Sequence, residues 1–338
     1  MEQISVVAPV YNELRETLYE FVSQVNEVMS KITGDYEIIL VDDGSENDAW
    51  KHISALAASD RHVRGLRLVR NFGQHVAITA GLDHADGDWV VVMDADLQDR
   101  PAVIPDLLAK AHEGYDAVFV DRQQRPESLL YQGLAATFYR LLNMLSGQEH
   151  NRLQGNFSII SAAVVRAFRS MREQTRFYGG MVRWMGFKQT SIVSKHGTRF
   201  AGPPAYDITK RFKLAFDLTV GFSTRILYIS IILGSLMAMS SFGMAAYVVA
   251  RTLAYPELPV LGWSSVMTAV MFTAGVTNVM VGLTGIYIGK IFEQSKSRPI
   301  YILRQRAGLP LDITAGVSLF KEIESMKETG KVAALVPQ

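Results

Sequence analysis

Two long uncharged stretches constrain this sequence more than any other feature. Residues 226–250 and residues 265–289 contain no Asp, Glu, Lys or Arg. A helix of about 20 apolar residues is long enough to cross the hydrocarbon core of a bilayer. A buried core helix also explains one apolar run, but two in tandem favour a pair of membrane-spanning helices. The sequence therefore predicts a C-terminal part embedded in a membrane.

Basic residues are concentrated outside this pair of stretches rather than between them. The connecting residues 251–264 carry only Arg251 and Glu257 as charges. Basic residues are retained preferentially on the cytoplasmic side of a membrane. We therefore expect both ends of the chain in the cytoplasm and residues 251–264 outside. The flanking basic residues are Lys210, Arg211, Lys213, Arg225, Lys290, Lys296, Arg298, Arg304 and Arg306.

The N-terminal part alternates between short apolar runs and longer helical patterns. Such alternation is typical of a parallel sheet with crossover helices, and strands rich in Val, Ile and Leu are buried on both faces. We therefore expect an α/β domain with a mostly parallel sheet. The predicted strands are residues 4–8, 37–41, 65–69, 89–93, 117–120 and 157–160, and the predicted helices are residues 13–31, 48–58, 75–85, 102–113, 128–145 and 162–171.

These patterns divide the chain into six segments. Residues 207–225 mix basic and apolar positions, which is typical of a helix on the membrane surface and equally of an amphipathic helix packed on the domain. The segments are a catalytic-type α/β domain at 1–206, a juxtamembrane segment at 207–225, a first span at 226–250, an outer loop at 251–264, a second span at 265–289 and a tail at 290–338.

Composition excludes several classes of function. The sequence has no cysteine, which excludes a disulfide framework, a thiolate zinc site and a cysteine nucleophile. The net charge of +1 gives no overall electrostatic footprint for nucleic acid. The N-terminus runs directly into a strand-like segment, so we predict no signal peptide there.

Polar segments follow three of the predicted strands. Pro9, Tyr11 and Glu13 come after the first strand, the run 42–45 (Asp-Asp-Gly-Ser) after the second, and the run 94–98 (Asp-Ala-Asp-Leu-Gln) after the fourth. Ligands bind at the carboxyl ends of the strands in an open parallel sheet. We therefore expect these segments to meet along one edge and form a site.

The run 94–98 has the composition of a divalent metal site. In an extended chain, residues two apart point the same way, so Asp94 and Asp96 would direct both carboxylates to one point, with Gln98 continuing the spacing. Hard oxygen ligands of this kind suit Mg²⁺ or Mn²⁺. Each motif alone also fits a plain structural role, since Asp-x-Asp and Asp-Gly-Ser are common in turns and Glu13 suits the first turn of a helix.

Four ordered motifs then carry a family resemblance. They are the runs 5–13 (Ser-Val-Val-Ala-Pro-Val-Tyr-Asn-Glu), 41–45 (Val-Asp-Asp-Gly-Ser), 71–74 (Asn-Phe-Gly-Gln) and 93–98 (Met-Asp-Ala-Asp-Leu-Gln). They resemble glycosyltransferase family two, and the C-terminal spans ending in Tyr-Ile-Gly-Lys-Ile at 287–291 narrow the resemblance to its bacterial polyprenyl-phosphate branch. The likeness covers nearly the whole chain to about residue 306.

The resemblance implies a GT-A-type, Rossmann-like fold and an inverting transfer of a sugar from a nucleotide to undecaprenyl phosphate. The implied setting is the cytoplasmic face of the bacterial inner membrane, with UDP a better expectation than GDP and a homo-oligomeric assembly. A lone basic residue also fits a solvated surface position. The implied site residues are Pro9, Tyr11, Glu13, Asp43, Asp94 and Arg122 for the nucleotide, Asp94, Asp96 and Gln98 for Mg²⁺ or Mn²⁺, and Arg199, Lys210 and Arg211 for the acceptor phosphate.

Two positions depart from the family pattern. Asn156 stands where relatives carry the Asp proposed as catalytic base, and Pro204-Ala205-Tyr206 replaces a Ser-Lys-Tyr near the membrane. An attacking hydroxyl benefits from a base, whereas a phosphate monoester is already an anion at pH 7. The amide of Asn156 therefore favours a phosphate acceptor. The alternatives are a hydroxyl-directed or processive polysaccharide synthase, and a non-catalytic nucleotide- or lipid-binding assembly partner.

Overall fold

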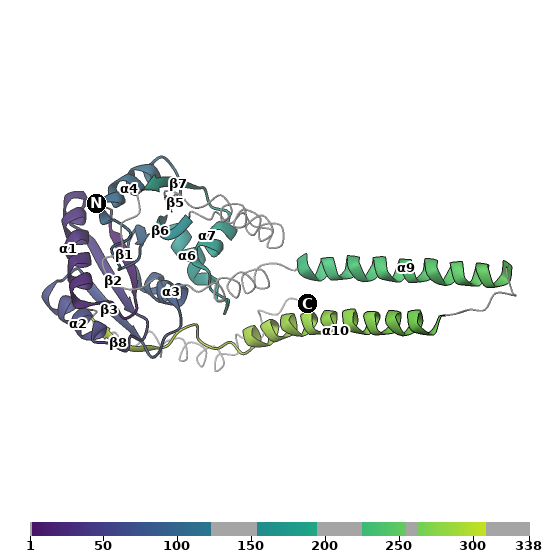
Figure 1. Ribbon diagram of the computed structural model, residues 1–338. Helices are drawn as coiled ribbons and strands as arrows, with labels where there is room; N and C mark the ends of the chain where they lie inside the picture. Colours follow the sequence, from purple (N-terminus) through teal and green to yellow (C-terminus); the bar gives the residue numbers. More distant parts are fainter. Residues whose placement is uncertain (1, 123–153, 195–224, 255–261, 309–338) are drawn as a thin grey trace, which may run out of the picture. The chain divides into compact units, whose positions relative to one another are not determined.

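The structure is a computed structural model and describes residues 2–122, 154–194, 225–254 and 262–308 (Figure 1). The chain forms two compact units. The first unit comprises Met1–Ala102 together with Tyr301–Gln338, and the second comprises Val103–Ile300.

Four parallel strands form the centre of the first unit. They are β1 (Ile4–Val10), β2 (Tyr36–Asp42), β3 (Val63–Leu68) and β4 (Trp89–Val92), which lie in the order β4-β1-β2-β3. Every residue of β2 is buried. This burial agrees with the continuous apolar composition expected for strands covered on both faces.

A fifth strand comes from the far end of the sequence. β8 (Leu303–Ala307) pairs with β3 in the antiparallel direction and occupies the edge of the sheet in this unit. Residues 303–307 were expected to belong to a separate tail, and no strand was predicted there. The α/β unit therefore includes residues from both sides of the two long apolar stretches.

Helices cover both faces of these strands. α1 (Arg15–Ile32) and α2 (Ala49–Ser59) lie on one face, and α3 (Gln74–His84) lies on the other (Figure 1). A Cβ atom at Gly81 would collide with the side chain of Val7, so glycine allows α3 to approach β1 closely. The buried face of α1 repeats every three to four residues, as an amphipathic helix requires; it consists of Thr17, Leu18, Phe21, Val22, Val25 and Met29.

The second unit contains a smaller group of strands with its own core. β5 (Ala117–Arg122) pairs with β6 (Gln154–Ser161) in the antiparallel direction and with β7 (Gln189–Ser194) in the parallel direction. The 3₁₀ turn η1 (Pro101–Val103) leads into α4 (Ile104–His112), which packs on β5 and β6. α6 (Ala162–Ser170) and α7 (Tyr178–Trp184) complete the core, in which Phe119, Phe168 and Tyr178 are fully buried.

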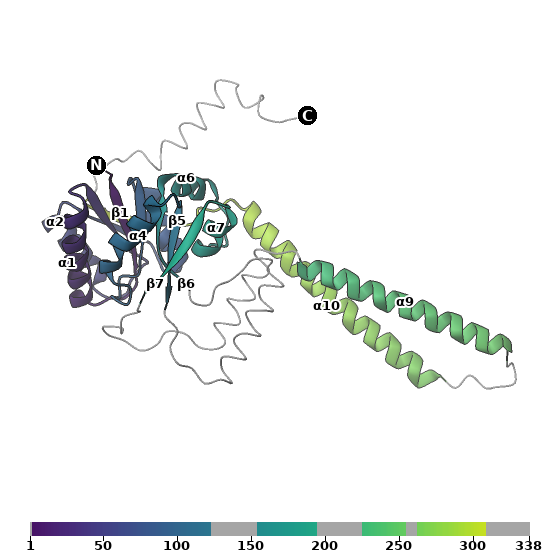
Figure 2. The same ribbon diagram turned by 90° about the horizontal axis from the view of Figure 1, so that it is seen from above.

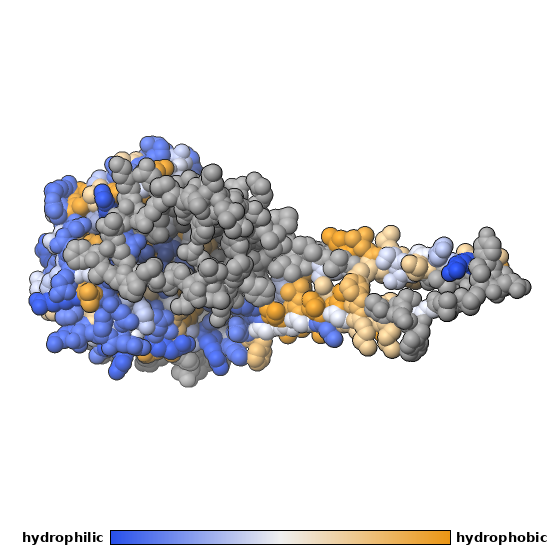
Figure 3. Space-filling model, in the orientation of Figure 1, coloured by the Kyte–Doolittle hydropathy of each residue, from blue (hydrophilic) through white to orange (hydrophobic). Residues whose placement is uncertain are grey.

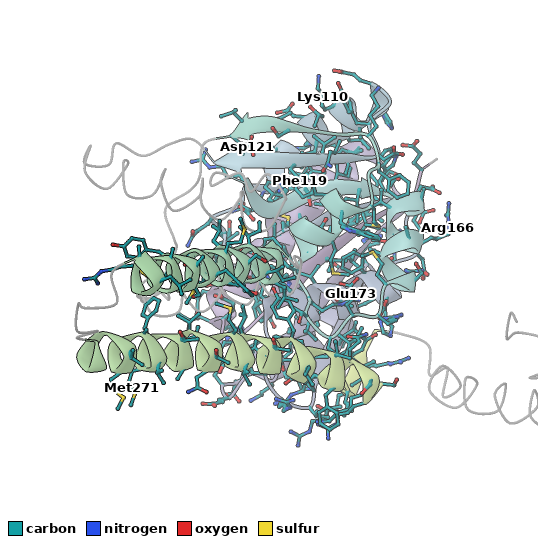
Figure 4. All side chains as sticks on the ribbon, turned by 90° about the vertical axis from the view of Figure 1, so that its right-hand side faces the viewer. Lys110, Phe119, Asp121, Arg166, Glu173 and Met271 are labelled. Carbon is teal, nitrogen blue, oxygen red and sulfur yellow. The ribbon has the colours of Figure 1, made fainter. Side chains whose placement is uncertain are left out.

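Both uncharged stretches are helical and belong to the second unit. α9 (Arg225–Ala254) and α10 (Trp263–Ser295) contact each other (Figure 2), and apolar side chains gather on their surfaces (Figure 3). Met271 on α10 is 65% exposed and points away from α9 (Figure 4). Exposed apolar side chains along a long helix are typical of a segment that contacts lipid or another protein.

Among the described residues, one segment has the length and apolar composition to cross a membrane. It is Ala269–Ser295, and the apolar part of α9, Ser230–Met244, is shorter. One of the two predicted spans is therefore long and apolar enough to cross a bilayer, by length and composition, and the crossing of both spans stays a prediction. The helix predicted at 128–145 and the juxtamembrane residues 207–224 lie outside the described residues.

Candidate functional site

The loops after β1 and β2 are hydrogen-bonded to each other. The backbone N–H of Asn12 donates to Ser45 Oγ at 2.9 Å, and the backbone N–H of Glu46 donates to Asn12 Oδ1 at 2.9 Å. Asn12 has a φ of 58°, a left-handed conformation that Asn tolerates better than most residues. These bonds leave the neighbouring Tyr11 with 44% of its surface exposed at the strand ends.

Asp42 and Gly44 shape the loop after β2. Asp42 is fully buried; its Oδ1 accepts the backbone N–H of Ser45 at 2.9 Å, and its Oδ2 lies 3.2 Å from Nε of Arg67 on β3. Gly44 has a φ of 68°, and a Cβ there would collide with the backbone of Arg70. Glycine is therefore required for the close passage of the chain beyond β3.

Asp43 binds the loop that follows β3. Its Oδ1 accepts the backbone N–H of Phe72 and its Oδ2 that of Gly73, both at 2.8 Å. The side chain is nearly inaccessible, with 2% of the residue exposed. Burial raises the pKa of the Asp43 carboxyl to about 6, although the two N–H donors act in the opposite direction. Asp43, expected to line a nucleotide pocket, thus holds the residues that lead into α3.

The first residue of α3 reaches the segment after β4. Gln74 Nε2 donates to Asp94 Oδ1 at 2.6 Å. The backbone N–H of Asp94 in turn donates to Oδ2 of the buried Asp99 at 3.2 Å. Asp94 is consequently oriented by contacts from both its own segment and α3.

The run 94–98 is a turn, so the expectation of an extended chain there is wrong. β4 ends at Val92, and Leu97 has a left-handed φ of 62°. Asp96 Oδ1 accepts the backbone N–H of Gln98 at 3.0 Å, which closes the turn. Alternation along a strand therefore does not explain the placement of Asp94, Asp96 and Gln98. All three side chains are half-buried rather than enclosed.

A continuous set of hydrogen bonds thus joins the ends of four strands. Asn12 and Ser45 connect β1 to β2, and Asp43 connects β2 to the residues after β3. Gln74 connects α3 to the residues after β4.

No group of three or more His, Cys, Asp or Glu in the described ranges has the arrangement of a metal site. The predicted set differs from such a group, because it combines two carboxylates with an amide. Its half-buried oxygen donors fit Mg²⁺ or Mn²⁺ by ligand type.

The remaining predicted residues belong to the second unit. Asn156 is a half-buried residue of β6, and its backbone carbonyl accepts the hydroxyl of Ser158 at 2.9 Å. Arg122 is the last residue of β5, and its side chain is not among those described. Arg199, Lys210 and Arg211 lie outside the described residues.

Sequence reasoning assigned no role to several residues that organise the first unit's strand ends. Gln74 belongs to the run 71–74, for which the sequence predicts no function, and the sequence predicts no partners for Asp99, Asn12 and Ser45. Their bonds run between loops that are distant in sequence. The signal available in the sequence is their position, since each lies within six residues of the end of a predicted strand.

The strand-end loops and the α/β fold agree with a known family. Residues 5–173 match the model of glycosyl transferase family 2. This match covers half of the chain, and relatives more than 30% identical cover most of the rest. The chain belongs to glycosyltransferase family 2, is a glycosyltransferase, and has a GT-A-like fold.

Three comparisons illustrate the range of similarity. An uncharacterized glycosyltransferase of Synechocystis sp. is 33% identical over 308 residues, which is 91% of this chain and 96% of the relative. The bactoprenol glucosyl transferase of Shigella phage SfV is 35% identical over 303 residues, which is 89% of this chain and 98% of the relative. A crystal structure of glucosyl-3-phosphoglycerate synthase from Mycobacterium tuberculosis, in complex with Mn²⁺, UDP and phosphoglyceric acid, is 20% identical in sequence and has a TM-score of 0.48. The similarity covers 65% of this chain and 76% of the chain in that structure.

Proposed function

We propose that this protein transfers a hexose, glucose in the first instance, from a uridine-diphosphate sugar to a polyprenyl phosphate at the cytoplasmic face of a bacterial inner membrane. The observation that carries the proposal is the extent of the likeness to the phage bactoprenol glucosyl transferase. An alignment over 89% of the chain includes the α/β part and the long helices together. Similarity in both parts supports a shared type of acceptor as well as a shared donor chemistry.

The strand-end loops of the first unit are the proposed donor site. Pro9 is the next-to-last residue of β1, and Tyr11 and Glu13 follow the strand. Tyr11 is exposed and the other two are half-buried, which suits contact with a nucleoside. Asp43 acts through the loop at 71–73, whose backbone it holds, rather than by exposed contact with the ligand. The site is preorganised in this way, so little ordering remains to be done when the donor binds.

Asp94, Asp96 and Gln98 are the residues that would hold Mg²⁺ or Mn²⁺. A bound divalent ion would neutralise charge on the departing nucleoside diphosphate. Gln74 orients Asp94, and the Gln98 backbone N–H orients Asp96, so both carboxylates have fixed positions without the ion. Outer contacts of this kind are a general feature of protein metal sites.

The proposed reaction needs no base in the protein. An oxygen of the lipid phosphate attacks the anomeric carbon, the bond from that carbon to the diphosphate oxygen breaks, and the nucleoside diphosphate leaves with the electron pair. The attacking phosphate is already an anion at neutral pH. Asn156 is therefore compatible with this acceptor, although its amide cannot accept the proton of an attacking hydroxyl. The chain's contribution is to position and to stabilise charge.

The pairing of β8 with β3 supports a two-span topology. β3 precedes the long helices in sequence and β8 follows them, yet the two strands are hydrogen-bonded neighbours on the same side of any membrane. If α10 crosses the bilayer, the chain must cross it an even number of times between these strands. α9 is the candidate for the return crossing, which agrees with the basic residues on both flanks.

The proposal is tested with the purified full-length protein in liposomes. The liposomes contain undecaprenyl phosphate and receive radiolabelled UDP-glucose with Mg²⁺ or Mn²⁺. The expected result is an organic-extractable product from which mild acid releases glucose. A water-soluble polymer or glycoside would favour the synthase alternative instead, and absence of any product with a panel of nucleotide sugars would favour the non-catalytic alternative.

A further inference from the structure

The loop between α6 and α7 is fastened to the C-terminal end of α10. The backbone N–H of Gln174 donates to Gln294 Oε1 at 2.8 Å, and Gln294 Nε2 donates to the carbonyl of Arg172 at 3.3 Å. Gln174 Nε2 reaches the carbonyl of Arg298 at 2.7 Å. Figure 4 marks this loop by Glu173, beside the end of α10. The Gln294 side chain thus bonds backbone groups of the loop, and the Gln174 side chain bonds the backbone beyond the end of α10. We call the two residues the glutamine pair.

The same loop is anchored on its other side in the core of the second unit. Arg176 is 8% exposed, its Nη1 donates to the carbonyl of Met171 at 2.5 Å, and its guanidinium lies 5.0 Å from the centre of the Phe168 ring. A buried cation over an aromatic face and a bond across the loop restrict the loop's conformations. The glutamine pair therefore connects α10 to a loop that is already held by the domain.

A short set of contacts continues from this loop to Asn156. The loop leads directly into α7, whose first residue, Tyr178, is fully buried. Its hydroxyl lies 2.8 Å from Ser158 Oγ, and the same Oγ bonds the carbonyl of Asn156 at 2.9 Å. In the sequence, α6 lies between β6, which carries Asn156, and the loop that carries Gln174.

We propose that the glutamine pair is a positioning device that sets α10 against the α6–α7 loop, so that the second unit meets an acceptor phosphate held at a fixed depth in the membrane. The inference rests on the proposed function, because it assumes a membrane-held acceptor. Gln294 is the next-to-last residue of Ala269–Ser295, the segment with the length and composition of a membrane span. It therefore stands where a spanning helix emerges from the bilayer.

The physical reason is that transfer depends steeply on the placement of the reacting groups. A soluble acceptor diffuses into the site and adapts to any orientation of the domain. An acceptor whose tail is fixed in the bilayer has a defined height, so a loosened connection between span and domain reduces the fraction of productive encounters. Loss of the glutamine pair should consequently affect the two kinds of acceptor differently.

The test compares wild type with Q174A, Q294A and Q294E, all as full-length protein in liposomes. UDP-glucose is the donor, and the acceptors are undecaprenyl phosphate in the membrane and a short, water-soluble prenyl phosphate. Q294A removes two hydrogen bonds and should lower kcat/KM for the membrane acceptor about tenfold, whereas Q174A removes one and should lower it about threefold. Q294E keeps the acceptor oxygen for the Gln174 N–H and should lie between Q294A and wild type. Transfer to the short acceptor should stay within about twofold of wild type.

E173A and E293A are the matched controls, because they change exposed neighbours of the glutamine pair. Both should leave both acceptors unaffected. Equal losses with the two acceptors, or no loss in Q294A, would overturn the inference.

A second readout does not depend on the proposed function. Hydrogen exchange of the Gln174 amide should be faster in Q294A than in wild type and E293A, because Gln294 Oε1 accepts that N–H. Unchanged exchange would show that the pair does not form in solution. Wild type that exchanges as expected but transfers sugar to neither acceptor would refute the proposed function instead.

Discussion

Asp96 is the residue on which the proposed donor chemistry can be tested most directly. Asp96→Asn removes a carboxylate charge but keeps an oxygen that can accept the Gln98 N–H, so the turn should survive. Replacing a negatively charged metal ligand by a neutral amide should lower transfer about a hundredfold or more. Initial rates at saturating metal give the comparison, and Asp106→Asn on the exposed face of α4 is the control. Activity close to wild type in Asp96→Asn would contradict the metal assignment.

His75 should make the fold sensitive to acid. Burial lowers the pKa of the His75 imidazole from 6.5 to about 4, so the folded chain keeps it neutral where the unfolded chain protonates it. Its contribution to stability is complete above pH 6.5 and is lost as the pH falls towards 4. Between pH 7 and pH 5 this loss should amount to roughly 1–2 kcal/mol, and His75→Asn should abolish it.

Thermal unfolding at each pH measures this effect as the difference between His75→Asn and wild type. The difference is needed because Asp43 changes the stability in the opposite direction. Its raised pKa of about 6 makes the fold less stable as the pH rises from 3.8 to 6. His112→Asn at an exposed position is the control and should follow wild type. Parallel pH curves for His75→Asn and wild type would refute the prediction.

At the scale of elements, β8 is a strand that the sequence pattern does not predict. Its five residues, Leu-Arg-Gln-Arg-Ala, lack the Val and Ile of the central strands. β8 is held in place by pairing with β3. The Tyr301 hydroxyl donates to Asp83 Oδ2 at 3.0 Å, and the backbone N–H of Val69 donates to the carbonyl of Ile302 at 3.0 Å. A strand of this kind covers an edge that would otherwise expose unpaired backbone groups.

Truncation separates the role of β8 from that of the residues after it. A chain ending at residue 300 lacks β8 and the Tyr301 contact, whereas a chain ending at residue 308 retains both. The shorter chain should melt several degrees lower and aggregate more readily, because the edge of β3 is uncovered. Differential scanning fluorimetry and light scattering compare the two. Identical behaviour would mean that β8 contributes nothing to the first unit.

At the scale of the whole molecule, the absence of cysteine allows the topology to be measured cleanly. Single cysteines introduced as Glu257→Cys and Lys296→Cys lie at opposite ends of the second predicted span. The two-span prediction requires a membrane-impermeant maleimide to label position 257 from outside intact cells, and position 296 only after lysis. Labelling of neither position before lysis would show that the helices do not cross the membrane.

Much of the fold could be predicted from local pattern. The first four strands and their crossover helices appear within about two residues of the expected positions, because apolar runs and helical periodicity are local signals. Residues 179–187 gave no clear pattern, and α7 forms there around the buried Tyr178. β7 was missed for the same reason as β8, since its Thr and Ser residues acquire a strand conformation by pairing with β5.

The sequence by itself determined which chemistry this chain can carry: carboxylates and amides after parallel strands, long uncharged helices, and no cysteine. Only the tertiary structure decided which of these residues act on one another. It closed the run 94–98 into a turn, buried Asp43 beneath the loop it binds, and brought Gln294 to Gln174. The physical reason is that hydrogen bonds between loops depend on a geometry that the whole fold imposes, whereas strands and helices begin with their own residues.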